Sequence, residues 1–480
     1  MADDVDAVVV GAGPNGLAAA IALAGAGLRV VVYEARPTVG GGTRTAELTL
    51  PGFRHDVCSA VHPMALASPF FEAFDLAAHG VRMLQPDVAF AHPLDGGRAG
   101  LAWRDVDRTA DGLGADGPAW RGLFGPLVRR WRDVVAVGMS DLRRVPSPVT
   151  AARLAALVVE LGTPLWGLRL RDDVSRAMLA GVAAHAISAP RAPVPAGVGL
   201  LLTTLAHAVG WPIPEGGSQA IADAMAAELS ARGGRLVTGH PVASLAELPR
   251  ARAILLDVAP AGLVRLAGSA LPAGYARRLR GFRYGPGVSK VDFALSGPVP
   301  WAARGCELAG TLHLVGSRPA AVAAERAVAA GKHAERPYVL AVQPGVVDPT
   351  RAPDGRHTFY TYTHVPHDSP LDVGDVVTAQ VERFAPGFRD LVVARHVVSA
   401  AEQSHHNANY VGGDIAAGAL SVWQTVMRPT PSWDPYRTPI EGVYLCSSST
   451  PPGPGVHGMS GIHAAGRALR QRFGITTDPL

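Results

Sequence analysis

Short apolar runs alternate with an alanine-rich stretch at the N-terminus. Residues 8–10 and 30–33 are apolar or aromatic at every position, which is typical of strands buried on both faces of a parallel sheet. Between them, residues 17–24 contain only Leu, Ala and Ile, which predicts a helix packed against that sheet. The pattern therefore predicts a strand–helix–strand unit of an α/β fold.

Helical spacing dominates the next part of the chain. Apolar residues recur three or four positions apart at 127–135 and again at 154–161. We predict a helical, substrate-facing cap over residues 76–200. A turn rich in Pro and Gly at 211–218 then precedes a helix expected from residue 219 to about residue 232.

Strand-like segments return after the cap. Residues 235–238, 253–257 and 443–446 are predicted to rejoin the N-terminal sheet. Alternating segments such as 289–295 and 357–364 predict a second, mostly antiparallel sheet. After residue 443 the chain is expected to form strand, loop and helix, the last with one apolar stripe from Ile462 to Phe473.

Composition excludes several classes of function. The 480 residues carry a formal net charge of +4 without a basic block, so no nucleic-acid partner is expected. The three cysteines are scattered singly, which favours neither a disulfide framework nor a zinc site, and no metal is predicted. The acidic start at residues 1–4 lacks a signal-peptide pattern, so we expect a cytoplasmic protein, monomeric or homodimeric.

The turn after the first strand carries a nucleotide-binding motif. Gly11 permits a tight turn, Gly13 lets the backbone approach a pyrophosphate, and Gly16 allows close packing of helix on strand. The N-terminus of the helix offers unpaired N–H groups to phosphate. Glu34 ends the second strand, where a carboxylate accepts ribose hydroxyls and disfavours the 2′-phosphate of NADP.

A second glycine-rich element favours FAD over NAD. Residues 40–44, Gly-Gly-Gly-Thr-Arg, follow Glu34 closely. The element resembles the second glycine motif of the FAD-binding class that includes phytoene desaturases and amine oxidases, in which it contacts the flavin diphosphate. No second complete GxGxxG unit and no CxxC motif is present in the sequence. Electrons are therefore expected to enter from the substrate and to leave to oxygen, a quinone or another carrier.

With both ends of the chain considered, the sequence resembles the phytoene desaturase-like FAD-dependent oxidoreductases related to pyridine nucleotide-disulfide oxidoreductase domain proteins. The resemblance extends over nearly the full length and includes GAGPNGLAAA, GGGTRT, PGFRHDVCSAVHP, GWPIPEGGSQAI, NANYVGGDI and YLCSSSTPPGPGVHGM. It implies FAD as cofactor, with Val242 contacting adenine from a strand-like segment. The implied cofactor-binding residues are Gly11, Gly13, Pro14, Asn15, Gly16, Glu34, Ala35, Gly41, Gly42, Thr43, Arg44, Val242, Ser448, Val456, His457, Gly458 and Met459.

The fold predicted from these observations is an α/β architecture in two parts. A Rossmann-type FAD-binding domain, discontinuous in sequence, is expected from residues 1–75, 201–270 and 401–480. An α+β substrate domain is expected from the helical cap at 76–200 and the mostly antiparallel sheet at 271–400.

Two histidines are the candidate catalytic residues. His62 lies in a segment that, by the resemblance, passes the flavin ring, and His457 lies beside the expected start of the last helix. Either could accept a proton if hydride abstraction also requires proton loss; the alternative is that each only holds a loop by hydrogen bonds. His405 and His406 are expected on opposite faces of a strand, which disfavours a metal site.

The predicted function is abstraction of a hydride from an apolar, isoprenoid-like or lipid-like substrate to flavin N5. Ser448 stands where amine oxidases of the class carry an acid, which favours the desaturase branch. A flavin amine oxidase, a flavin-dependent isomerase without net redox change, and a non-catalytic flavin-binding protein remain as alternatives. An apolar segment with arginines at 165–171 leaves open a peripheral membrane contact, against the alternative of core packing.

Overall fold

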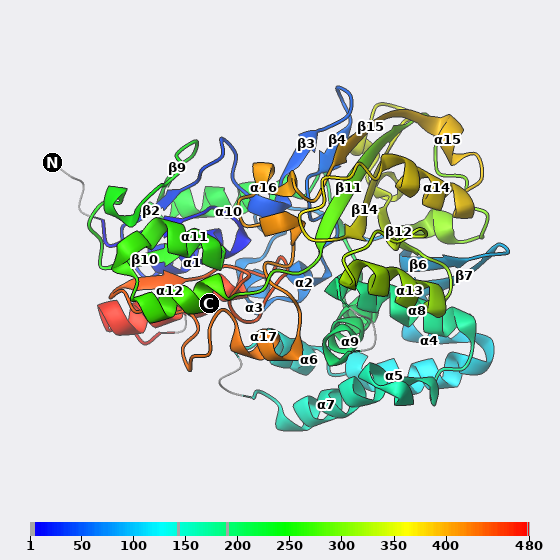
Figure 1. Ribbon diagram of the computed structural model, residues 1–480, viewed down its shortest axis with the longest axis horizontal. Helices are drawn as coiled ribbons and strands as arrows, with labels where there is room; N and C mark the ends of the chain where they lie inside the picture. Colours follow the sequence, from blue (N-terminus) through cyan, green and yellow to red (C-terminus); the bar gives the residue numbers. More distant parts are fainter. Residues whose placement is uncertain (1–4, 142–144, 189–191, 478, 480) are drawn as a thin grey trace.

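A five-stranded parallel sheet lies at the end of the molecule that carries the N-terminus (Figure 1). The computed structural model describes residues 5–141, 145–188, 192–477 and 479. The strand order is β16-β10-β1-β2-β9, and each neighbouring pair is parallel. Its strands are β1 (Ala7–Val10), β2 (Val30–Tyr33), β9 (Arg235–Val237), β10 (Ala253–Leu256) and β16 (Val443–Leu445). The prediction that distant segments build one Rossmann-type sheet is confirmed.

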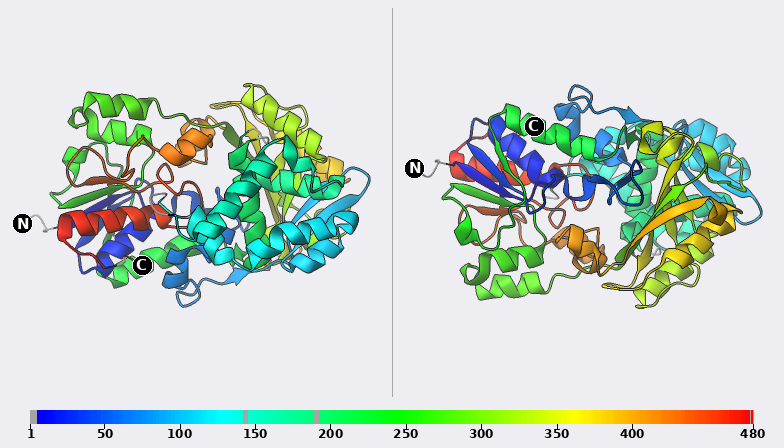
Figure 2. Two further views of the ribbon diagram at one scale, coloured as in Figure 1. Left: turned by 90° about the horizontal axis from the view of Figure 1, so that it is seen from below. Right: turned by 90° about the horizontal axis from the view of Figure 1, so that it is seen from above.

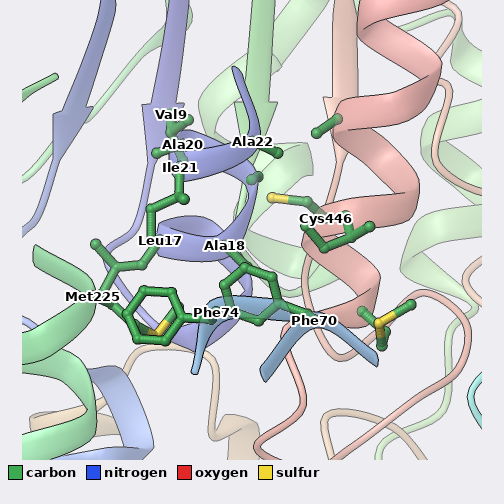
Figure 3. Packing of buried hydrophobic residues seen from close by; sticks show 14 of the residues in the cluster. Val9, Leu17, Ala18, Ala20, Ile21, Ala22, Phe70, Phe74, Met225 and Cys446 are labelled. Atoms are coloured by element: carbon green, nitrogen blue, oxygen red, sulfur yellow. The ribbon is translucent and has the colours of Figure 1, made fainter. Parts of the chain in front are cut away.

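Helices cover both faces of this sheet (Figure 2). On one side α1 (Pro14–Gly25) packs against α10 (Gln219–Ala231) and α18 (Met459–Ala468). Figure 3 shows the resulting core, in which Leu17 and Ile21 of α1 lie among Phe70, Met225 and Cys446. On the other side, α11 (Pro260–Ala267) and α12 (Ala273–Arg280) bury a second apolar cluster against the strands.

A seven-stranded mixed sheet forms the opposite end of the molecule (Figure 1). Its order is β15-β11-β14-β13-β12-β6-β7, and every pair is antiparallel except β12 with β6. The strands are β6 (Val88–Leu94), β7 (Arg98–Trp103), β11 (Gly287–Leu295), β12 (Ala309–Leu314), β13 (Val339–Val342), β14 (His357–Val365) and β15 (Val392–Val398). The mostly antiparallel sheet predicted from alternation is thus confirmed.

A layer of helices lies beside the second sheet and reaches toward the first. It comprises α4 (Val106–Asp111), α5 (Gly117–Val128), α6 (Trp131–Gly138), α7 (Pro148–Gly162), α8 (Asp173–Ala183) and α9 (Pro193–Ala208). On the outer face, α14 (Gly374–Phe384) packs against β12, β13 and β14, whereas α13 (Arg318–Ala329) contacts α8 of the helical layer. Shorter elements are α2 (Pro63–Ala67), α3 (Pro69–Phe74), α15 (Phe388–Leu391), α16 (Gln403–His406), α17 (Val422–Met427), β3 (Thr45–Glu47), β4 (Arg54–Asp56), β5 (Met83–Leu84) and β8 (Ile213–Pro214).

The structure corrects the expectation that residues 76–200 are helical throughout. Their first third contains β5, β6 and β7, of which β6 and β7 belong to the seven-stranded sheet. All seven residues of β6 are buried, so the strand shows no alternation of apolar and polar positions. A strand covered on both faces loses the period of two that identifies it from sequence.

Two local predictions are also wrong. Val242 lies in an irregular connection after β9 rather than on a strand, and His405 and His406 lie in the short helix α16 rather than on a strand. Leu170 is fully buried in the core, whereas Leu165 and Leu168 are exposed. The side chain of Trp166 lies outside the described residues. Among the helices described, none combines the length and apolar character needed to cross a membrane.

Candidate functional site

The glycine turn after β1 has the geometry expected of a phosphate-binding loop. Gly11 has a φ of 100°, in the region that favours glycine. A Cβ on Gly16 would overlap the carbonyl oxygen of Gly11, so helix and turn approach too closely for any other residue. Helix α1 begins at Pro14 with Gly13 as N-cap and no side-chain cap. Because Pro14 has no N–H and the Gly16 N–H is bonded to Asp257, the Asn15 N–H is the group in this first turn that is left for a ligand among the described contacts.

Glu34 lies at the end of β2 beside this turn. Its Oε2 accepts a hydrogen bond from the Ala12 N–H (2.8 Å), and its Oε1 accepts one from the Arg36 N–H (2.9 Å). Each carboxylate oxygen has a second lone pair, so the side chain retains capacity to accept from a ribose. Glu34 lines the cavity described below, and its contact with a ribose stays a prediction.

Asp257 is a buried carboxyl group at the same turn that sequence reasoning did not single out. It follows β10, and its Oδ2 accepts a hydrogen bond from the Gly16 N–H (3.1 Å). Burial, together with the nearby charge of Glu34, raises the pKa of Asp257 to about 7. The only signal in the sequence is its position at the end of a strand that pairs with β1.

The second glycine element folds back against the first. Gly40 has a φ of 115°, and Gly41–Thr43 form one 3₁₀ turn. A Cβ on Gly41 would lie 3.2 Å from the Cα of Gly13, so the two glycine turns face each other across a narrow gap. Arg44 donates from Nε to the Gly41 carbonyl (2.9 Å) and from Nη2 to the His406 carbonyl (2.5 Å). Arg44 thereby fastens this loop to α16.

The C-terminal loop reaches the same site. The Nδ2 of Asn15 donates to Ser448 Oγ at 3.4 Å, which joins residues from the two ends of the chain. The Oδ1 of Asn15 is buried and has no partner among the described residues. Arg428 donates to the carbonyl of Ser448 (3.0 Å) and holds the loop from behind.

Hydrogen bonds define the tautomer of His62. The hydroxyl of Ser218 donates to the carbonyl of Ser59 (2.7 Å), so it accepts from Nε2–H of His62 (2.8 Å). Nδ1 of His62 is therefore a bare acceptor, buried and without a partner among the described residues. Burial lowers the pKa of His62 to about 4, so the ring is neutral near neutral pH.

His457 is held differently. Its Nδ1 accepts from the Met459 N–H (3.0 Å), and its Nε2–H donates to the Gly453 carbonyl (3.1 Å). Burial lowers the pKa of His457 to about 4. Because both ring nitrogens are engaged, this geometry favours a structural task in the loop over proton transfer. The catalytic role expected for His457 stays a prediction.

One cavity of about 970 Å³ joins these elements. At one end it is lined by the two glycine turns, Glu34, Asp257 and the C-terminal loop. At the other end it is lined by aliphatic side chains of α6, α7 and α9, namely Val134, Val137, Leu154, Val158, Val194, Val198, Leu201 and Leu202. Strands β12–β14 supply a third wall with Thr311, Leu340, Val342, Tyr360 and Tyr362. Figure 1 shows the helices below and between the two sheets.

Most of the predicted cofactor residues line this cavity, including Asn15, Arg44, Val242, Ser448 and Val456. Three do not: Gly16 lies behind the first turn, Gly458 caps α18 against Phe70, and Met459 packs into the core. Asn409 belongs to a segment that carries the sequence resemblance, and it lies beside the first glycine turn: its amide donates to the Asp257 carbonyl (3.0 Å), and its Oδ1 accepts from the Ala259 N–H (2.8 Å). Asn409 lies in the NANYVGGDI segment but makes its contacts through tertiary structure.

Comparison with known proteins supports the coarse assignment. Residues 9–76 match the NAD(P)-binding Rossmann-like domain family. The chain is 26% identical to pyridine nucleotide-disulfide oxidoreductase domain-containing protein 2 of Rattus norvegicus, over 96% of this chain and 93% of that protein. It is 30% identical to a limonene dehydrogenase polypeptide of Castellaniella defragrans over 32% of this chain and 28% of that polypeptide.

The fold matches a solved oxidase. Putrescine oxidase bound to putrescine covers 98% of this chain and 99% of its own, with a TM-score of 0.60 and 17% identity. The chain is therefore similar over nearly its full length to a protein named as an oxidoreductase domain protein, residues 9–76 match a Rossmann-like domain, and the predicted fold class is confirmed. The finer resemblance to phytoene desaturases stays a prediction.

Proposed function

We propose that this protein is an FAD-dependent oxidoreductase that removes a hydride from an apolar substrate. The observation that carries the proposal is one continuous cavity, which joins the two glycine turns to a chamber walled by aliphatic side chains. Pockets of this kind, mostly apolar with a few placed polar groups, are typical of small-molecule sites.

The residues at the polar end fit FAD. The two glycine turns face each other so closely that a Cβ on Gly41 would lie 3.2 Å from the Cα of Gly13, and the buried Oδ1 of Asn15 lacks a partner among the described residues. Glu34 favours an unphosphorylated ribose. Gly11, Gly13 and the N-terminus of α1 would hold the diphosphate, and Asn15 with Ser448 would face the ribityl chain. Bound FAD would supply a hydride acceptor at flavin N5.

The rest of the chemistry depends on this chain's own residues. The aliphatic walls from α6, α7 and α9 exclude water and hold the substrate, and alignment to within about 3.5 Å is a large part of hydride-transfer catalysis. When the product is a C=C bond, a proton leaves together with the hydride. We propose that His62 accepts it at Nδ1; the hydrogen bonds by which Ser218 and Ser59 hold Nε2 in its protonated form support this role. The electron acceptor is oxygen, a quinone or another carrier.

A relative in sequence and two neighbours in fold favour different substrates. The name limonene dehydrogenase specifies a terpene hydrocarbon and supports an apolar substrate. The fold shared with putrescine oxidase and with cyclohexylamine oxidase favours an amine instead. The carboxylates among the described cavity-lining residues are Glu34 and Asp257, both bonded to the glycine turn. The aliphatic chamber thus offers no acid to an ammonium group from its described residues, which favours the apolar substrate.

Purification followed by anaerobic screening tests the proposal. We expect a yellow protein with flavin absorbance that is bleached by terpene hydrocarbons or related apolar compounds. Bleaching by amines, with hydrogen peroxide formed on aeration, would replace the proposal by amine oxidation. A change in substrate stereochemistry without any electron acceptor would indicate an isomerase. A colourless protein that takes up no FAD would overturn the proposal.

A further inference from the structure

The sheet wall of the cavity carries hydrogen-bonding groups that the proposed chemistry does not use. Across β12, β13 and β14 the register places Thr311 beside Val342 and Val342 beside Tyr360. One step along, His313 lies beside Leu340 and Leu340 beside Tyr362. Because residues two apart on a strand share a face, both rows belong to the side of the sheet that faces the cavity.

Thr311 is an unsatisfied polar group in this wall. The residue lines the cavity and is 1% exposed, yet its hydroxyl has no hydrogen-bond partner among the described residues. Leaving a buried hydroxyl unpaired costs about 1–3 kcal/mol, so such groups are uncommon unless a ligand or water satisfies them. Tyr362 also lines the cavity, and its phenol makes no hydrogen bond to a described residue.

His185 completes the polar edge. It lines the cavity between Trp211, whose ring centroid lies 5.5 Å away, and His313, whose Nε2 shares a 2.9 Å hydrogen bond with Nε2 of His185. This contact leaves Nδ1 of His185 for a ligand. His313 is two residues from Thr311 on the same strand, so the His185–His313 pair and the Thr311 hydroxyl occupy the same part of the wall.

The surroundings disfavour a charged ligand group. Burial lowers the pKa of His185 to about 3 and that of His313 well below its usual value, so both rings are neutral. The buried carboxylates near this part of the sheet already have partners: Asp292 is paired with Lys290, which lies over the Tyr360 ring, and Glu325 is bonded to His364 Nδ1 (2.7 Å) beside Tyr362. Desolvating an unpaired ammonium or carboxylate here would cost far more than desolvating a hydroxyl.

We propose that Thr311 and His185 form a subsite for an uncharged oxygen, a hydroxyl or carbonyl, on an otherwise apolar substrate. Tyr362 borders the subsite across the aliphatic pair Leu340 and Val342. The inference rests on the proposed function, because it assigns the orientation of the substrate in the same cavity. It narrows the substrate class from hydrocarbons to neutral terpenoid- or lipid-like alcohols and ketones.

Matched probes on the purified holoprotein test the subsite. Limonene, perillyl alcohol and perillylamine share one skeleton and differ in carrying no polar group, a hydroxyl or an ammonium. Binding is followed by calorimetry and by perturbation of the flavin absorbance. We expect perillyl alcohol to bind about tenfold more tightly than limonene, as one or two neutral hydrogen bonds allow.

Variants of the cavity wall test whether Thr311 causes the difference in affinity between perillyl alcohol and limonene. Thr311→Val keeps the shape and removes the hydroxyl, so it should weaken perillyl alcohol about three- to tenfold and leave limonene unchanged. Thr311→Ser should restore the affinity for the alcohol, and Tyr362→Phe serves as a second variant should Thr311→Val fail to fold. Thr358→Val is the matched control, because Thr358 is also a buried threonine without a partner among the described residues but does not line the cavity.

The outcomes separate the two proposals. The subsite is overturned if perillyl alcohol and limonene bind equally tightly, or if Thr311→Val weakens the binding of both to the same extent. It is also overturned if calorimetry detects binding of none of the probes. If flavin is bound and bleached by limonene in those cases, the proposed function stands. Tightest binding by perillylamine with formation of hydrogen peroxide overturns the apolar-substrate function and the subsite together.

Discussion

At the residue scale, two carboxyl groups, those of Glu34 and Asp257, accept hydrogen bonds from backbone N–H groups of the first glycine turn and its surroundings. Glu34 accepts two backbone N–H groups and is oriented by them, whereas Asp257 accepts one from Gly16. The pKa of Asp257 is raised from 3.8 to about 7 because burial disfavours its charged form. A buried carboxyl of this kind links the stability of the turn to pH.

The substitution Asp257→Asn tests this linkage in the flavin-free protein. Between about pH 4 and pH 7 the folded wild type retains a proton that the unfolded chain has lost, so its free energy of unfolding falls as pH rises through this window. Asparagine keeps an oxygen acceptor for the Gly16 N–H but does not ionise. The free energy of unfolding of the variant, measured relative to that of the wild type, should therefore rise by on the order of a few kcal/mol from pH 4 to pH 8. Urea denaturation at both pH values measures this, and parallel pH curves would contradict it.

Glu34 and His62 should have separable effects. Glu34→Ala removes the acceptor for Ala12 N–H and for the ribose, so we expect FAD retention to weaken at least about tenfold. His62→Ala should leave FAD bound and slow flavin reduction by about 10²–10⁴-fold if His62 accepts a proton. Flavin content after gel filtration and anaerobic stopped-flow reduction measure the two effects. Unchanged retention in Glu34→Ala would refute the ribose assignment.

At the element scale, the contact of α1 with α18 joins the two ends of the chain. A Cβ on Gly461 of α18 would overlap the carbonyl oxygen of Asn15 on α1. The two helices therefore approach backbone to backbone, and this approach brings Asn15 near Ser448. Glycine at this position is required by space rather than by its φ angle.

Gly461→Ala should separate the two helices. We expect a loss of about 2–3 kcal/mol in the free energy of unfolding, as overpacking typically costs, together with reduced flavin retention. Gly122→Ala is the matched control, because Gly122 lies in α5 with nothing within 4 Å of an added Cβ. The control should gain about 0.5–1 kcal/mol from helix propensity. Similar stabilities of the two variants in thermal denaturation would contradict the packing argument.

Helices and strands could be predicted from the sequence in two situations. In the first, one face of the element is buried and the other is solvated; in the second, a wholly apolar run of residues stands next to a recognisable motif. The strands Ala7–Val10 and Val30–Tyr33, and the helix Gln219–Ala231, follow the sequence pattern closely. Val88–Leu94 was missed because helices and a second layer bury both of its faces, which erases alternation. His405 and His406 form a single helical turn too short to show any period.

At the scale of the whole molecule, four separated stretches of chain share one cavity. Its walls come from the N-terminal glycine turns, the sheet of residues 309–365 and the C-terminal loop, with helices α6, α7 and α9 opposite. A ligand that contacts all of them stabilises the folded state without binding the unfolded chain. Its binding free energy therefore adds to the stability of the whole fold.

Flavin removal should consequently lower the melting temperature of the entire protein. At a free FAD concentration of about 100 times the Kd, the bound form gains about 2.7 kcal/mol. Differential scanning calorimetry of holo- and apoprotein measures this as one cooperative transition that moves upward with added FAD. A transition unaffected by FAD would contradict a site built from distant segments.

The sequence alone determined the dinucleotide-binding unit, because turn, helix start and terminal acid are local features whose chemistry requires particular residues at fixed spacing. Gly11, Gly13, Gly16 and Glu34 could be assigned without knowing any long-range contact. Only the tertiary structure decided that Asp257 lies under that turn, that His62 keeps a bare Nδ1, and that Thr311 and His185 line the same cavity. These residues come from strands and helices far apart in the chain, and no local pattern records which side chains are left unpaired when the layers pack together.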